Sequence, residues 1–199
     1  MLPLSGSADL GQQVPLEWAV ANVNHAGGVA GARVELALAD LSSEDVATAA
    51  RRLLADASVL AVIGPDTSAA AVDVAPWFIQ ARKPLISPSA TSGDLFRMFA
   101  GKKYFWRTVE SDISQVQTLV LLASRAGAHR VALLSSGDSY GNTFFDWALL
   151  FAGANPFESS FGAHYDTGLN TWLADEFSSA LVQRAKGVSP WALCTASST

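Results

Sequence analysis

The order of apolar and polar positions predicts helices and strands that follow one another along most of the chain. Apolar residues recur every three to four positions in some segments, as on one face of a helix, while other segments are short apolar or alternating runs. The predicted helices cover 14–24, 44–55, 68–81, 113–126, 140–152 and 169–185. The predicted strands cover 33–40, 59–63, 84–87, 104–107, 130–135, 158–163 and 191–195.

Local signals set the ends of several elements. Helix 14–24 places its apolar residues on one face and stops at Gly27-Gly28, whose backbone freedom suits a helix end. Ser42 or Ser43 is expected to cap helix 44–55. The run Val59 to Ile63, followed by Gly64-Pro65, is typical of a parallel strand covered on both faces.

Strands joined by helices of about a dozen residues indicate right-handed βαβ units. We therefore predict an α/β protein with doubly wound, mostly parallel sheets. The polar stretch from Thr108 to Gln115 is the expected division between two lobes, with an N-terminal lobe over 1–112 and a second lobe over 113–199.

Composition narrows the classes of function. Half of the 199 residues are hydrophobic, which is enough for a substantial core, and the formal net charge is -5. Because Lys and Arg form no run, nucleic acid is not an expected partner. One cysteine and three histidines without ligand spacing predict no metal site, and no G-x-G-x-x-G follows a strand, so no cofactor is expected.

No apolar run reaches the roughly 20 residues that a membrane span needs, and the N-terminus lacks the regions of a signal peptide. Residues 1–6 nevertheless read as the end of a strand that enters a loop, and the chain stops shortly after another predicted strand. We therefore expect a sequence that is truncated at both ends.

Ligands of open α/β sheets bind beyond the carboxyl ends of the strands. At one such end Thr67 and Ser68 begin a helix, where hydroxyls and backbone N–H groups attract an anion; the alternative is a simple helix cap. At another, Ser87 to Thr91 ("SPSAT") supplies further hydroxyls, although its composition is also that of an ordinary loop.

Gly137-Asp138-Ser139-Tyr140-Gly141 fits the G-x-S-x-G pattern of a hydrolase nucleophile elbow. Ser139 follows a predicted buried strand, as that pattern requires. The segment His25-Ala26-Gly27-Gly28 has some similarity to the oxyanion loop of such hydrolases, but that loop should follow a strand, whereas His25 ends a predicted helix. In the expected order Ser, acid, His, only His164 lies downstream as a candidate base. A turn between a strand and a helix explains the motif equally, and catalysis by Ser139 is the third-ranked hypothesis.

Several segments together resemble the type I periplasmic binding proteins, in particular the branched-chain amino-acid (Leu/Ile/Val) group that serves ABC transporters. The matching segments occur in the family's order. They are "PLSG" at 3–6, "NHAGGVAGARVELALAD" at 24–40, "VIGPDTSAAA" at 62–71, "KPLISPSAT" at 83–91, "FWRTVESDISQ" at 105–115 and "DSYG" at 138–141. Family members are nearly twice as long, so the resemblance implies a complete first lobe and a shortened second one.

The resemblance implies five ligand-binding residues. Ser68 and Thr91 would hold the carboxylate of an amino acid, and the Ser89 carbonyl and the Thr91 hydroxyl would meet its ammonium group. Ala90, between Ser89 and Thr91, is the fourth of the five contacts. Tyr140 would close over the ligand from the second lobe. Such a zwitterion suits a helix N-terminus at its negative end and strand-end carbonyls at its positive end.

The function implied is a non-enzymatic solute-binding protein. It would capture an amino acid or related carboxylate in the cleft between its lobes and deliver it to the permease subunits of an ABC transporter. It would be periplasmic or extracellular, with its signal peptide missing from the present sequence, and would meet the membrane only through the permease or a missing lipid anchor. The alternative is the ligand-sensing domain of a receptor or regulator with the same fold.

Overall fold

The computed structural model describes residues 10–41, 43–127, 130–153, 159–165 and 193–196. These residues divide into two compact units. The first contains the residues up to Ala90 together with Gly101–Thr108, and the second contains Thr91–Ala100 and the residues from Val109 onward. The chain therefore passes from one unit to the other after Ala90, Ala100 and Thr108.

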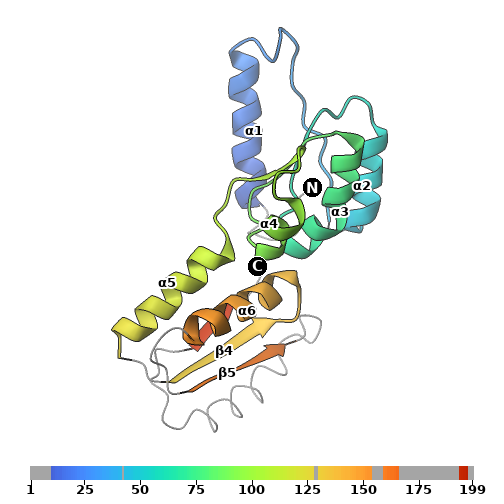
Figure 1. Ribbon diagram of the computed structural model, residues 1–199. Helices are drawn as coiled ribbons and strands as arrows, with labels where there is room; N and C mark the ends of the chain where they lie inside the picture. The colour runs from blue at the N-terminus through green and yellow to red at the C-terminus, as the bar shows by residue number, and fades with distance from the viewer. Residues whose placement is uncertain (1–9, 42, 128–129, 154–158, 166–192, 197–199) are drawn as a thin grey trace. The chain divides into compact units, whose positions relative to one another are not determined.

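The first unit has a parallel sheet of three strands in the order β1-β2-β3. The strands are β1 (Val62–Ile63), β2 (Leu85–Ser87) and β3 (Phe105–Arg107). Leu85 pairs with Val62 on one side and with Phe105 on the other. The helices are α1 (Leu10–His25), α2 (Val46–Ala55) and α3 (Ser68–Ala81). Figure 1 shows α2 and α3 side by side, and their buried apolar residues form the core with the fully buried Leu85.

The segment 33–40 differs from the prediction, because the structure assigns no strand to it. Asn24, at the end of α1, accepts a hydrogen bond from the Val34 N–H (2.7 Å) and donates one to the Val34 carbonyl (2.8 Å). A side-chain amide thus occupies two backbone groups that a strand partner would use. An alternating pattern is therefore not sufficient for a strand where a local side chain supplies the pairing.

The end of α2 depends on a residue distant in the sequence. The Lys83 ammonium, just before β2, donates to the carbonyls of Leu53 (2.9 Å), Leu54 (3.3 Å) and Asp56 (2.8 Å). The last carbonyls of a helix have no partner within the helix, and a cation is favourable beside them. Lys83 therefore fastens the carboxyl end of α2 to the start of β2.

The cap of α2 is Asp45, and the predictions of Ser42 or Ser43 as the cap were wrong. Asp45 accepts hydrogen bonds from the Thr48 amide (2.9 Å) and the Thr48 hydroxyl (2.5 Å). These bonds favour the charged carboxylate and lower the pKa of Asp45 below its ordinary value of 3.8; the bond from the Thr48 hydroxyl has the larger effect.

This cap predicts a specific loss of stability in acid. Because the pKa is lower in the folded state, the contribution of Asp45 is fully present above pH 3.8 and is lost as the pH falls through the folded-state value. Replacing Asp45 with serine keeps a capping oxygen but removes the titrating group. In urea unfolding measured from pH 5 to pH 2, the native protein should lose more stability than the Asp45→Ser variant, and parallel curves would contradict the assignment.

The second unit has three parallel strands in the order β5-β4-β6. They are β4 (Arg130–Ser136), β5 (Ser159–Tyr165) and β6 (Leu193–Ala196), and its helices are α4 (Gly93–Phe99), α5 (Asp112–Arg125) and α6 (Ser139–Gly153). Figure 1 shows α6 beside the β4–β5 pair. Val116 and Val120 of α5 pack with Phe144 of α6 in a buried cluster.

The predicted α/β class with parallel sheets is confirmed in both units. Helix α4 was not predicted, because its seven residues are too few to display a helical period. The predicted helix 169–185 lies outside the described residues. Among the helices of the described ranges, none has the length and apolar character to cross a membrane.

Candidate functional site

Two loops of the first unit are joined at the carboxyl edge of its sheet. The Ser87 hydroxyl donates to the Pro65 carbonyl (2.6 Å), and the Ser89 hydroxyl donates to the Asp66 carbonyl (2.7 Å). The Ala90 N–H donates to the Ser87 oxygen (3.1 Å). The loop that follows β2 is therefore held directly against the loop that precedes α3, and serine hydroxyls supply the contacts.

Ser68 is the first residue of α3 and is buried, with 4% of its surface exposed. The Thr67 hydroxyl caps this helix by accepting from the Ala70 N–H (3.3 Å). Ser68 therefore begins a helix whose preceding loop is hydrogen-bonded to Ser89, within one unit.

The N-terminus of α3 differs electrostatically from those of four other described helices. It has no acidic residue in its first turn and is capped by a neutral hydroxyl. The starts of α2, α4, α5 and α6 each have an aspartate. These are Asp45, Asp94, Asp112 and Asp138, respectively. Asp66 immediately precedes the Thr67 cap and is therefore also near the start of α3. Since the N-terminus of a helix carries a partial positive charge, the first turn of α3, which has no acidic side chain, is suited to an external carboxylate.

Arg107 lies at the carboxyl end of β3 and was not identified from the sequence. Its Nη1 atom is 3.4 Å from the Ala90 carbonyl oxygen, and its side chain is only partly exposed. Ala90 itself is fully buried. A positive charge therefore lies at the same sheet edge as the serine loops. The sequence signal that could have identified it is an arginine at the last position of a predicted strand.

Thr91 and Tyr140 belong to the second unit. Thr91 immediately precedes Ser92, the cap of α4, and its carbonyl accepts from the Asp112 N–H (3.1 Å) at the start of α5. Tyr140 is the second residue of α6, half-buried, with its ring 5.9 Å from that of Phe144. Each residue is thus at the start of a helix.

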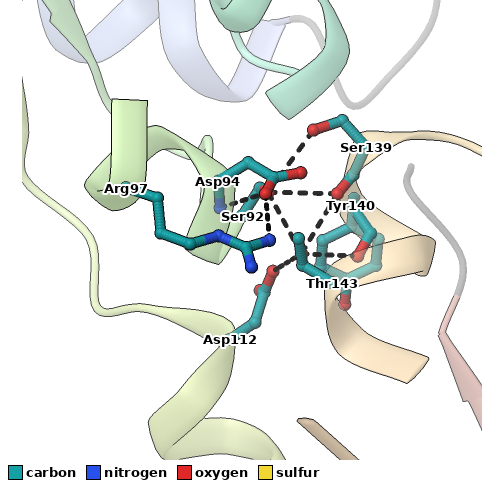
Figure 2. Close-up of polar contacts among 7 residues, drawn as sticks. All are labelled: Ser92, Asp94, Arg97, Asp112, Ser139, Tyr140 and Thr143. Carbon is teal, nitrogen blue, oxygen red and sulfur yellow. Dashed lines mark hydrogen bonds and ion pairs between the residues drawn. The ribbon is translucent and has the colours of Figure 1, made fainter. Parts of the chain in front are cut away.

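A polar cluster joins the starts of the three helices of the second unit (Figure 2). Ser92 Oγ lies 3.0 Å from Thr143 Oγ1 and 3.0 Å from the Ser139 carbonyl oxygen. Thr143 Oγ1 is 3.3 Å from Asp112 Oδ2. Ser92 and Asp112 are fully buried and Thr143 is 1% exposed. We call Ser92, Asp112 and Thr143 the helix-start cluster.

Ser139, the residue of the hydrolase hypothesis, borders this cluster. Its hydroxyl lies 3.4 Å from Ser92 Oγ, and its carbonyl oxygen lies 3.0 Å from Ser92 Oγ and from Thr143 Oγ1. A serine nucleophile needs an imidazole or another base within hydrogen-bond reach. The contacts described for Ser139 are instead those of a residue that begins a helix.

Within the described ranges, no three residues of the types His, Cys, Asp and Glu gather in a way that could hold a metal ion. The chemistry of the sheet edge in the first unit is that of hydroxyls, backbone groups and one guanidinium. Such groups can bind and orient a polar molecule.

Comparison with known proteins identifies the class to which this fold and these loops correspond. A model of the periplasmic binding protein family matches residues 2–196, and the chain belongs to that family. The resemblance inferred from the sequence segments is thereby confirmed.

Among solved structures, the chain is similar to an ABC transporter substrate-binding protein from Desulfitobacterium hafniense in complex with Leu. The two share 27% identity over 83% of this chain and 50% of that one, with a TM-score of 0.64. It is also similar to LivJ, a branched-chain amino acid transporter substrate-binding protein from Streptococcus pneumoniae, in complex with isoleucine. That match has 26% identity, a TM-score of 0.70, and covers 93% of this chain and 52% of that one. The chain thus spans about half the length of these proteins.

A further match links the chain to a receptor. It is 38% identical to human "Taste receptor type 1 member 1" over 86 residues, which are 42% of this chain and 10% of the receptor. This match covers too little of either protein to assign the chain to that receptor's group.

Proposed function

We propose that the protein is the solute-binding component of an ABC transporter and that its ligand is an amino acid or a closely related carboxylate. The observation that carries the proposal is the sheet edge of the first unit. There the start of α3, which has no carboxylate of its own in the first turn, adjoins the serine loop that follows β2. The related proteins with Leu and isoleucine bound support this choice of ligand class.

Ser68, Ser89, Ala90, Thr91 and Tyr140 are the proposed ligand contacts. Ser68, at the positive end of α3, and Thr91 would bind the carboxylate, and the Ser89 carbonyl and the Thr91 hydroxyl would bind the ammonium group. Tyr140 would pack its ring on the ligand. No residue would act as an acid, a base or a nucleophile, so the protein would release its ligand unchanged to a permease at the cell envelope.

Calorimetric titration with L-leucine and L-isoleucine tests this function, and 4-hydroxybenzoate is included as a carboxylate without an ammonium group. An amino acid should bind, and its decarboxylated amine should bind far more weakly because the start of α3 would lose its anionic partner. Absence of heat with every carboxylate, or equal affinity for acid and amine, would overturn the proposed ligand class. Turnover of an activated ester that disappears in Ser139→Ala would restore the hydrolase hypothesis.

Replacing Thr91 with valine should weaken binding of the amino acid by roughly 1 to 3 kcal/mol, because a buried charged group would lose a hydroxyl partner. Thr118→Val on the exposed side of α5 is the matched control, and it should leave the affinity unchanged. Titration calorimetry gives both values. An unaltered affinity in Thr91→Val would remove Thr91 from the site.

The second candidate is the ligand-sensing domain of a receptor, which the match to the taste receptor favours. Both candidates require the same ligand chemistry, so binding alone does not separate them. Deleting the gene from its host should abolish uptake of the labelled amino acid if the protein serves a transporter. Normal uptake with an altered response to the same amino acid would favour the sensor.

A further inference from the structure

The helix-start cluster connects two of the proposed ligand contacts within the second unit. Thr91 is followed directly by Ser92, and Tyr140 precedes Thr143 by less than one helical turn. Ser92 and Thr143 are the residues whose hydroxyls meet at 3.0 Å. This contact and the equally short one from Ser92 Oγ to the Ser139 carbonyl oxygen (3.0 Å) link the start of α4 to the first turn of α6.

The contacts form a closed ring. The Thr91 carbonyl accepts from the Asp112 N–H (3.1 Å), Asp112 Oδ2 lies 3.3 Å from Thr143 Oγ1, and Thr143 Oγ1 lies 3.0 Å from Ser92 Oγ. Ser92 closes the ring through its peptide bond to Thr91. Because a closed ring cannot open at one contact without straining the others, it fixes the three helix starts more firmly than separate contacts would.

Ser92 also orders its own helix, because its Oγ accepts from the Asp94 N–H (3.1 Å) as the cap of α4. Thr143 in turn lies 3.1 Å from the Tyr140 carbonyl oxygen. These buried hydroxyls lie away from water, so a partner removed from the cluster is not replaced by solvent.

We infer that Ser92 and Thr143 are positioning residues, which set the places of Thr91 and Tyr140 through the ring that they form with Asp112. The relevance to ligand binding rests on the proposed function, whereas the coupling of the three helix starts does not. Thr143 would act on a ligand only through Thr91 and Tyr140.

Amide hydrogen exchange without ligand tests the ring itself. Thr143→Val keeps the shape of the side chain but removes the hydroxyl, and should speed exchange at the Asp94 and Asp112 amides about tenfold. Thr143→Ser should restore slow exchange. The control is Thr118→Val. The Thr118 hydroxyl lies 2.8 Å from the carbonyl oxygen four residues earlier, and the Thr143 hydroxyl lies 3.0 Å from the corresponding carbonyl oxygen, but Thr118 is outside the ring. Unchanged exchange in Thr143→Val, or a uniform rise throughout the second unit, would overturn the inference.

Titration with L-leucine and L-isoleucine tests the consequence for the ligand. Thr143→Val should weaken binding about tenfold in the native background but less than twofold in a Thr91→Val/Tyr140→Ala background, because its effect passes through those two residues. Equal losses in both backgrounds would contradict positioning. If the native protein binds neither amino acid, the proposed function fails, and the exchange measurement still decides the ring. Should Thr143→Val not fold, Ser92→Ala removes the other half of the same contact.

Discussion

Replacing Phe78 with alanine is expected to lower the free energy of unfolding of the first unit by about 3 to 5 kcal/mol. Phe78 lies in α3, has no exposed surface and is one of the largest fully buried side chains among the described residues. Truncation would remove apolar area from the core and leave a cavity that neighbouring helix and strand atoms fill only in part.

Urea unfolding followed by circular dichroism measures this loss. Trp18→Ala is the control within the same unit, since Trp18 of α1 is 71% exposed and its truncation should change stability by less than about 1 kcal/mol. A similar change in both variants would mean that α3 does not pack on the sheet as described. Because α3 also carries Ser68, a loosened α3 should weaken ligand binding as well.

Replacing Gly141 with alanine should cost about 3 kcal/mol or more in the second unit, because overpacking against the backbone cannot be relieved by a rotamer change. A Cβ at position 141 would lie 2.0 Å from the Ser136 carbonyl oxygen and 2.4 Å from Ser136 Oγ. Ser136 ends β4, so the strand or the helix would have to shift. The Asp138 carboxylate already connects β4 with α6, because it accepts hydrogen bonds from the Ser136 hydroxyl (2.8 Å) and from the Gly141 N–H (2.9 Å).

The neighbouring exposed residue provides the control for Gly141. Asn142→Ala should alter the unfolding midpoint in urea by the equivalent of no more than about 0.5 kcal/mol. Native stability in Gly141→Ala would refute the close approach of α6 to β4. The second glycine of the G-x-S-x-G pattern is thus explained by the packing of a helix start against a strand end, without a nucleophile.

The elements that the sequence predicted well are those whose signals are local. Helix α3 begins and ends at the predicted residues, 68 and 81, because a hydroxyl cap precedes a regular apolar face. Strands β2 and β3 lie within one residue of their predicted bounds for a similar reason, since turn residues or charges flank short apolar runs. Segment 33–40 shows the limit, because a strand also needs a partner that its own sequence does not specify.

The polar contacts of the site could be predicted only in part. Serines and threonines after a strand indicate a binding edge, which is how Ser68 and the 87–91 loop came to notice, whereas Ser89 was singled out by the family resemblance. The helix-start cluster joins residues that are 31 to 51 positions apart, and no local pattern relates them. Helix α4, too short to display a helical period, has a cap, Ser92, whose hydroxyl also contacts residues of α6 that its own segment does not specify.

Lys83 has a consequence for the order in which the first unit assembles. The three carbonyls that it binds are 27 to 30 residues earlier in the chain. The last turn of α2 therefore lacks its cationic partner until the chain has returned at β2, and α2 on its own would fray at that end. Completion of this helix and docking of the strand become a single cooperative event.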